Sequence, residues 1–277
     1  MYTNKIISKI SSLAIIVTAI VFLASCKGGI KSADQDQLAA DSLNKELLAS
    51  DIQEVLYPLP TPFEMTKMLN DIGAAYTSKN LNAAKNTEKY ITEQSKAVNL
   101  GIYVADLTYA STYQQQQDIQ TYLNSIRTLA DQLGITYDYS KLLSDDYKAK
   151  FENKDSLTAI VANTIYDTYQ YLDKKSNPDL AVNMVAGMWI ELMYIATNIS
   201  EDSYNFSGLV DIISKQKASY EKVMSLLSSR NTNADIKSLE IKLQLLKPVY
   251  DKVDTGLTQT DYNLILKTIR EVRNSLI

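Results

Sequence analysis

The sequence has no histidine and a single cysteine among 277 residues. Histidine is the most frequent general acid and base in enzymes and, with cysteine, supplies most zinc ligands, so histidine-based catalysis and ordinary zinc sites are excluded. One cysteine cannot form a disulfide within the chain. No glycine-rich phosphate loop is present either. We therefore expect no cofactor and no metal site, and any enzyme would depend on carboxylates, tyrosines, serines and lysines.

Glycine and proline are also scarce, with 8 and 5 residues. Many short strands would need many turns, and these two residues supply most turn positions. The composition therefore favours long helices over a sheet.

The first 25 residues have the layout of a secretory signal peptide. They contain Lys5 and Lys9, no acidic residue, and an apolar run over 13–23. A bilayer span needs about 20 consecutive apolar residues, so this run is too short to remain as a membrane helix. We expect it to be removed.

The residues that follow, Leu23-Ala24-Ser25-Cys26, resemble a bacterial lipobox. In a lipobox the cysteine receives palmitate-type acyl chains, becomes the first residue and anchors the protein to a membrane. The alternative is an ordinary signal peptide followed by a buried free cysteine. Lys27 follows in place of aspartate, a pattern that resembles outer-membrane lipoproteins and leaves the inner or surface leaflet open.

The charge balance argues against a nucleic-acid partner. Without Lys5 and Lys9 the chain keeps 26 basic and 32 acidic residues, so no basic surface is expected. The membrane contact would come only from lipid on Cys26. We divide the chain into a signal peptide (1–25), a lipidated cysteine with a polar tether (26–55) and a helical domain (56–277).

Apolar residues recur with a helical period through the mature chain. Gly134 is placed to end one helix at positive φ, and Thr258 to Asp261 are placed to cap the last. The pattern predicts an all-α fold, a single globular antiparallel bundle or array; a repeat solenoid is the lesser alternative. We count about nine helices if the third and fourth form one kinked pair, at 62–78, 80–98, 100–116, 117–133, 140–150, 156–173, 178–200, 206–229, 233–254 and 257–276.

One predicted helix is apolar almost all round. Between 180 and 199 only Asn183, Glu191, Thr197 and Asn198 interrupt the apolar residues. Such a helix is typical of the centre of a domain. A membrane span is the alternative, but Asn183 and Glu191 near its middle would be costly in lipid.

Two carboxylates stand among apolar neighbours, Asp106 in "NLGIYVADLTYASTY" and Glu191 in "MWIELMY". A carboxylate in such surroundings needs a partner or a raised pKa, and perturbed acids often mark functional sites. We hypothesise a shared polar pocket of Asp106 and Glu191 with Tyr103 or Tyr109. In the alternative, a tyrosine hydroxyl, a backbone amide or a lysine bonds each carboxylate, which then only fixes helix register.

Tyrosine is unusually frequent, at 19 residues against four phenylalanines. Tyr103, Tyr109, Tyr113 and Tyr122, with the run Gln114–Gln117, offer stacking faces and amides for a groove that binds a sugar or peptide. A compositional bias toward tyrosine, with the rings at helix edges, is the other interpretation.

At "YPLPTPFEM", "LGIYVADLTYASTY", "DSLTAIV" and "MWIELMY" the chain resembles a family of helical lipoproteins from Bacteroidota to which no activity is attached. The likeness covers most of residues 56–200. It implies an all-α lipoprotein and adds no catalytic residue. In that phylum an Asp-Ser-aliphatic motif resembles an O-glycosylation acceptor, which would make Ser42 and Ser156 acceptors, although Ser156 is also placed to cap a helix.

Three functions follow in decreasing order of support. The first is a non-enzymatic lipoprotein of the outer membrane that binds or scaffolds a protein partner in an envelope complex. The second is a small-ligand or glycan binder that uses the Tyr/Gln-rich groove. The third is a carboxylate-dependent enzyme with a hard cation, which would need three converging carboxylates where the sequence offers only Asp106 and Glu191.

Overall fold

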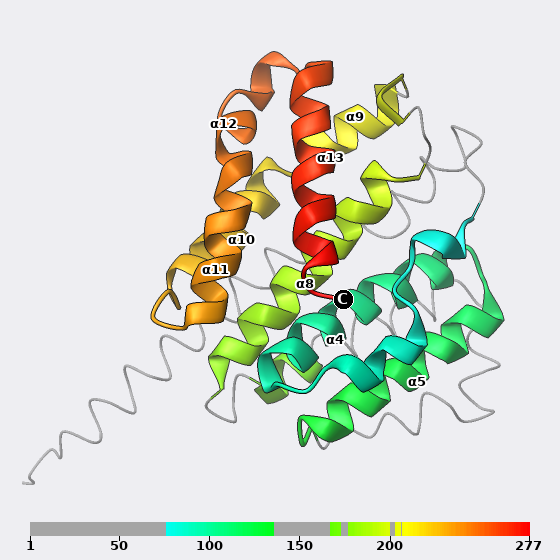
Figure 1. Cartoon of the computed structure of the whole chain (residues 1–277). Helices are drawn as coiled ribbons and strands as arrows, with labels where there is room; N and C mark the ends of the chain where they lie inside the picture. The colour runs from blue at the N-terminus through cyan, green and yellow to red at the C-terminus, as the bar shows by residue number, and fades with distance from the viewer. Residues whose placement is uncertain (1–75, 136–166, 173–176, 200–202, 206) are drawn as a thin grey trace, which may run out of the picture. The chain divides into compact units, whose positions relative to one another are not determined.

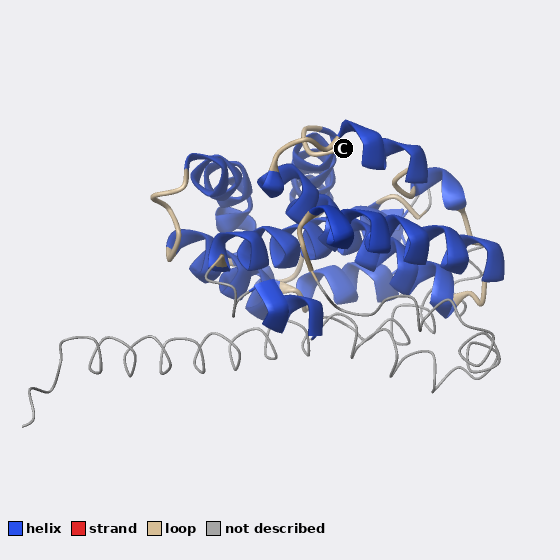
Figure 2. Ribbon diagram, turned by 90° about the horizontal axis from the view of Figure 1, so that it is seen from below, coloured by secondary structure: helices blue, strands red, loops and turns tan. Residues whose placement is uncertain are grey.

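The computed structural model describes residues 76–135, 167–172, 177–199, 203–205 and 207–277. The predicted signal peptide and tether, with Cys26 and Ser42, lie outside the described residues, as does Ser156. The described part contains helices and no strand (Figure 2), so the all-α prediction is confirmed there. Its α-helices are α4 (Glu93–Thr112), α5 (Gln116–Gln132), α8 (Pro178–Thr197), α9 (Ser207–Ser214), α10 (Lys217–Ser228), α11 (Ala234–Leu243), α12 (Lys247–Tyr250) and α13 (Gln259–Asn274). Its 3-10 helices are η2 (Ser78–Asn80), η3 (Ala84–Lys89), η5 (Ser203–Asn205), η6 (Gln244–Leu246) and η7 (Val253–Thr255).

Helix α8 forms the centre of the described part, as its apolar composition predicts. It packs against α4, α9, α10 and α13 (Figure 1). By length and composition α8 could cross a membrane, but 89% of its apolar window is buried inside the protein. A core helix has this property because its neighbours, rather than lipid, cover its apolar surface. Trp189, near its middle, is fully buried.

The contact between α4 and α8 is close because each helix places a glycine against the backbone of the other. An added Cβ on Gly101 would overlap the carbonyl oxygen of Met184 and lie 2.9 Å from the amide nitrogen of Met188. An added Cβ on Gly187 would overlap the carbonyl oxygen of Val98. Glycine inside a helix costs about 1 kcal/mol relative to alanine. Here it allows two backbones to approach to a distance that no other residue permits.

The two central helices run in the same direction, whereas the sequence predicts antiparallel neighbours. Gly101 faces Met184 and Met188, and further along both helices Asp106 interacts with Glu191. The antiparallel expectation comes from short connections, which constrain only helices that follow one another in the chain. Helices α4 and α8 are not consecutive, so the expectation does not constrain them. Helices α8 and α13, also far apart in the chain, run in opposite directions, since Glu191 pairs with Arg273 and Thr197 accepts a hydrogen bond from Tyr262.

The predicted helices 80–98 and 100–116 are wrong in their boundaries. The structure has a 3-10 helix over 84–89, and then α4 runs unbroken from Glu93 to Thr112 through Asn99 and Gly101. The side-chain oxygen of Thr92 accepts a hydrogen bond from the amide of Ser95 and caps this helix. Tertiary packing against α8 holds Gly101 in the helix, where intrinsic propensity alone suggests a break.

The predicted helices 206–229 and 233–254 are both divided in the structure. In the first, the amide of Gln216 bonds to the carbonyl of Ile213, three residues back instead of four, and separates α9 from α10. In the second, Pro248 has no amide hydrogen to donate to Gln244, and the chain tightens into η6 just before it. The apolar spacing continues across both breaks, so periodicity alone does not reveal them.

Two predicted helix ends are confirmed. Gly134 follows α5 at a φ of 68°, and Thr258 and Asp261 form a reciprocal capping box at the start of α13. The predicted range 178–200 corresponds to α8. Almost all of the predicted helix 62–78 and the whole of 140–150 lie outside the described residues. Of the predicted helix 156–173, the structure describes 167–172, which is helical.

We expect Gly101→Ala and Gly187→Ala each to lower the free energy of unfolding by about 2 to 3 kcal/mol, because the added methyl meets backbone that can only move if the helices separate. In a helix free of neighbours the same substitution would stabilise by about 1 kcal/mol, so the sign of the effect is decisive. Urea denaturation gives the value. Gln120→Ala, at an exposed position on α5, is the control; a gain of stability for either glycine variant would contradict the close contact.

Candidate functional site

The most unusual group of side chains is a buried ion pair between α8 and α13. Nε of Arg273 donates to Oε2 of Glu191 at 2.6 Å, and the terminal nitrogen Nη2 donates to Oε1 at 2.8 Å. Only 5% of the arginine side chain and none of the glutamate is exposed. Two parallel hydrogen bonds hold the guanidinium and carboxylate groups in one plane. The two opposite charges stabilise each other at a buried place where water does not solvate them.

Arg273 contacts two further groups besides Glu191. Its Nη2 donates to the backbone carbonyl of Asn80 at 2.9 Å, at the end of η2. Its guanidinium carbon lies 4.0 Å from the centre of the Tyr194 ring, in a cation–π contact. One side chain from the last helix therefore joins η2, α8 and α13.

Asp106 on α4 is the second carboxyl group of this cluster and is fully buried. Its Oδ2 accepts a hydrogen bond from the amide of Asn82 at 3.1 Å. No donor of the described part reaches its Oδ1, and the carboxylate of Glu191 is close enough to act on the pKa of Asp106. Two carboxyl groups can share a hydrogen bond only if one of them carries a proton, and the raised pKa of Asp106 assigns that proton to Asp106.

The electrostatic environment agrees with a protonated Asp106. Burial raises the pKa of the Asp106 carboxyl well above its usual range, the charge of Glu191 raises it further, and the guanidinium of Arg273 acts against both. Burial also raises the pKa of Glu191, but two hydrogen bonds from Arg273 oppose this directly. The cluster thus holds one cation, one anion and one neutral acid, which is the arrangement with no net buried charge.

Asparagines extend this cluster toward the segment before α4. Asn82 is buried and donates from its side chain to the hydroxyl of Tyr90 at 2.9 Å, and Asn86 donates to Asn82 at 2.7 Å. Asn99 donates to the carbonyl of Leu276 at 2.8 Å. Hydrogen bonds of these three asparagines therefore link residues 80–90, α4 and the C-terminal residues inside the protein.

The structure brings together three of the four predicted pocket residues. Asp106 and Glu191 interact directly, and Tyr103 is fully buried near Asp106, with its hydroxyl donating to the carbonyl of Ala83 at 2.9 Å. Tyr109 belongs to a separate cluster in which its ring centre lies 5.0 Å from that of Tyr76. The described part places Asp106, Glu191 and Tyr103 in packed interior, each with an exposed fraction of 1% or less.

Arg273 is the member of this cluster that the sequence analysis missed. It follows Ile265, Ile269 and Val272 on the face of the last helix that is buried. A cation on an apolar face, in a chain with two carboxylates on other apolar faces, is the signal that would have found it. Asn82 and Asn99 carry no comparable signal.

The tyrosines proposed to line a groove are mostly interior. Tyr103, Tyr109 and Tyr122 are buried, and the ring centres of Tyr103 and Tyr122 lie 6.1 Å apart. Tyr113 is half-buried beside Tyr109. In the run Gln114–Gln117, the first two residues form the turn between α4 and α5, where Gln114 has a φ of 55°, and the last two begin α5. Burial removes most of the aromatic surface that a ligand would stack on.

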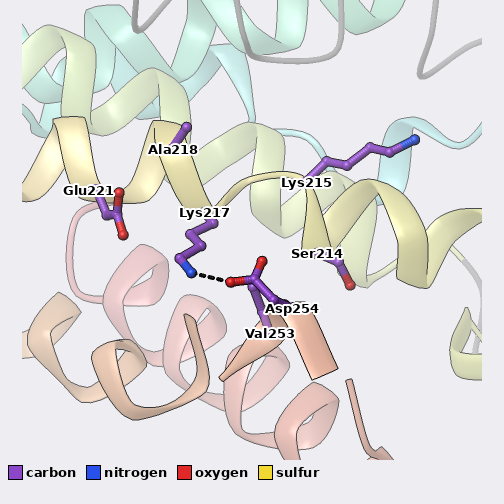
Figure 3. Close-up of a pocket in the computed structure, with 7 residues that line it drawn as sticks. All are labelled: Ser214, Lys215, Lys217, Ala218, Glu221, Val253 and Asp254. Carbon is purple, nitrogen blue, oxygen red and sulfur yellow. Dashed lines mark hydrogen bonds and ion pairs between the residues drawn. The ribbon is translucent and has the colours of Figure 1, made fainter. Parts of the chain in front are cut away.

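A surface depression of about 410 Å³ lies elsewhere, between the start of α10 and η7 (Figure 3). Nζ of Lys217 is 2.6 Å from Oδ2 of Asp254 across it, and Asp254 is 76% exposed. An exposed pair of opposite charges already satisfies both partners and binds a further ligand weakly. The lining residues are Ser214, Lys215, Lys217, Ala218, Glu221, Val253 and Asp254.

Among the described residues no three acidic side chains lie close enough to hold a metal ion. Comparison with protein-family models, with curated proteins and with solved structures finds no match to this chain.

The protonated Asp106 predicts a pH dependence of stability. The pKa of Asp106 is raised only in the folded state, so folding takes up a proton at pH values above the usual pKa of a carboxyl group. The free energy of unfolding therefore falls as the pH rises toward the raised pKa, by up to about 1.4 kcal/mol per pH unit. Asp106→Asn has a neutral side chain at every pH and can donate to Glu191. Urea denaturation from about pH 5 to about pH 8 should show Asp106→Asn gaining stability relative to the unmodified chain.

Glu191→Gln tests the same charge balance by removing the negative charge of Glu191. Without the Glu191 charge, Arg273 draws a negative charge onto Asp106, so the pH dependence should weaken. The double variant Asp106→Asn/Glu191→Gln leaves Arg273 with no counterion and should lose about 3 to 5 kcal/mol, more than the two single variants together. A constant difference in stability between Asp106→Asn and the unmodified chain across pH would show that Asp106 is ionised in the folded protein. Additive effects of the two single variants would show that Asp106 and Glu191 do not share Arg273 as their counterion.

Proposed function

We propose that this chain is a lipoprotein anchored to the outer membrane through Cys26, whose helical domain is a non-enzymatic binding or scaffold module of an envelope complex. The observation that supports the second half is the orientation of its unusual ionisable groups. Asp106, Glu191 and Arg273 are turned inward, against one another, with exposed fractions of 5% or less. Groups held in this way stabilise helix contacts and do not meet a substrate in this state of the protein.

The first half of the proposal is supported by the N-terminal sequence. Lys5 and Lys9 precede a short apolar run, and Leu23-Ala24-Ser25-Cys26 follows it at the place where a lipobox lies. Acyl chains contribute about 0.8 kcal/mol of membrane binding for each buried methylene group, so two or three chains are enough for stable attachment. Lys27 favours the outer membrane.

Binding of a small ligand or glycan through Tyr103, Tyr109 and the Gln114–Gln117 run is the alternative. The burial of both tyrosines weighs against it, because stacking on a sugar requires an open aromatic face. A carboxylate-dependent enzyme has less support still, since Asp106 and Glu191 already share one proton and one arginine.

Replacing Cys26 tests the anchor. We expect Cys26→Ser to lose incorporation of labelled palmitate and to move from the membrane fraction to the soluble fraction, because serine offers no thiol for acylation. The helical domain should keep its far-UV circular dichroism. Ser25→Gly is the control, since it keeps a small residue beside the cysteine. Labelling of Cys26→Ser, or a Cys26 found unmodified by mass spectrometry, would end the lipoprotein proposal.

Purification of the native protein after cross-linking in cells tests the scaffold. We expect a partner protein of the envelope in a fixed ratio to the chain, retained equally by Asp106→Asn because that substitution lies inside the domain. Recovery of the chain alone, together with a ligand-binding activity that Asp106→Asn or Glu191→Gln abolishes without unfolding, would instead support the pocket as a functional site.

A further inference from the structure

The outer face of α11 and α12 carries a stripe of uncharged residues. We call Ala234, Ser238, Ile241, Leu245 and Pro248 the outer stripe; they are spaced four and three residues apart in alternation, and all five are exposed. Ile241 is 57% exposed and Leu245 is 59% exposed. Alternating spacings of three and four are those of the seam along which two helices pack in a coiled coil.

The outer stripe lies opposite the face that belongs to the core. The same helical run buries Ile236, Leu239, Leu243, Leu246 and Tyr250. Exposure of Leu245 and Pro248 shows that η6 does not rotate the stripe into the interior. Figure 1 shows α11 beside α10 and α13, which cover its inner side. A single exposed leucine is ordinary, but here two large apolar side chains, Ile241 and Leu245, lie one turn apart on a face that has no charged residue along its centre.

Charged residues on either side of the outer stripe indicate what packs against it. Along one edge Lys237, Gln244 and Asp251 follow one another at intervals of seven residues, so the charge runs from positive through neutral to negative. Such an edge is complementary to itself when one copy is reversed. In coiled coils, charges at these flanking positions determine whether the two helices pack parallel or antiparallel.

We propose that two copies of this chain pair through their outer stripes, with α11 of one copy antiparallel to α11 of the other about a two-fold axis near residue 243. Ile241 then packs against the partner's Leu245, and Ser238 against the partner's Pro248. Lys237 meets the partner's Asp251, and by symmetry this ion pair forms twice. Gln244 meets the partner's Gln244 near the axis.

The parallel arrangement is disfavoured by the same residues. In a parallel coiled coil, the position occupied by Lys237 faces the partner residue five positions further on, which is the partner's Lys242. Two such repulsions replace the two attractions of the antiparallel pair. In the antiparallel pair Lys242 lies on the other edge near the axis, but its Nζ donates to Oγ of Ser275 at 3.0 Å and is held toward α13. Asp251 also pairs with Lys247 of its own chain at 2.8 Å. Because this pair is exposed, the Asp251 carboxylate can interact with Lys247 and with the partner's Lys237 together.

One helix from each copy forms a small interface, at the low end of specific contacts, below about 1,200 Å². The dimer is therefore weak in dilute solution and forms at high local concentration. Attachment of both copies to one membrane surface would supply that concentration. This increase in concentration depends on the proposed lipid anchor, whereas the pairing itself does not.

Disulfide cross-linking of the full chain in its native membrane tests the pair. Gln244→Cys places a thiol near the two-fold axis, so mild oxidation should give a covalent dimer on a non-reducing gel. Gln120→Cys, also at an exposed position, on α5, measures random collision, and the unmodified chain with only Cys26 measures background. Adding Leu245→Asp to Gln244→Cys should lower the dimer fraction about tenfold or more, because a buried leucine is lost from both layers.

Charge reversal tests the orientation in the Gln244→Cys chain. Lys237→Asp alone or Asp251→Lys alone should lower the dimer fraction roughly two- to fivefold, and the two together should restore it, because the pair re-forms with its charges exchanged. Far-UV melting of each variant shows that the domain is folded, since these positions are exposed. Equal dimer yields for Gln244→Cys and Gln120→Cys, or no restoration by the double reversal, would overturn the proposal.

Discussion

The backbone-to-backbone contact between α4 and α8 is the constraint on which the rest of the domain depends. Gly101 and Gly187 let the two helices approach until only a hydrogen atom separates their backbones. Because the helices run in the same direction, Asp106, five residues beyond Gly101, and Glu191, four residues beyond Gly187, arrive at the same place. The close contact thus forces two carboxyl groups together in the interior, and the chain has to satisfy them there.

It satisfies them with one arginine and one proton. Arg273 neutralises Glu191, and Asp106 remains uncharged, so the cluster carries no net charge. Buried ion pairs add little net stability compared with apolar packing, but breaking one is costly. The pair therefore specifies an arrangement: α13 can dock against α8 and η2 only in the register that places Arg273 between Glu191 and Asn80. Together with the hydrogen bonds from Tyr262 to Thr197 and from Asn99 to Leu276, it fixes the position of the C-terminal helix, where apolar contacts alone would tolerate sliding.

The polar groups of the described part divide into two sets with different roles. Inside, asparagines, the two acids and Arg273 bond to one another and fix helix positions. Outside, α11 presents uncharged residues opposite its core face, flanked by charges that change sign along the helix. The proposed scaffold role would use this division, since a rigid interior keeps the outer faces in fixed geometry.

Periodicity, composition and capping residues were enough to predict an all-α fold, a central helix at 178–200, the glycine that ends α5 and the capping box of α13, because these depend on neighbours within one or two turns. The lipobox interpretation of residues 23–26 also depends on local sequence only, and it stays a prediction. Tertiary structure decided the rest. The predicted boundary between 80–98 and 100–116 falls inside α4, which continues through Gly101 because α8 packs on it. Asp106 and Glu191 could be recognised as unusual acids, but their meeting depends on the parallel course of two helices far apart in the chain, and their counterion Arg273 lies 82 residues beyond Glu191. A contact between distant segments is set by how apolar faces pack in three dimensions, and no local pattern in the sequence encodes it.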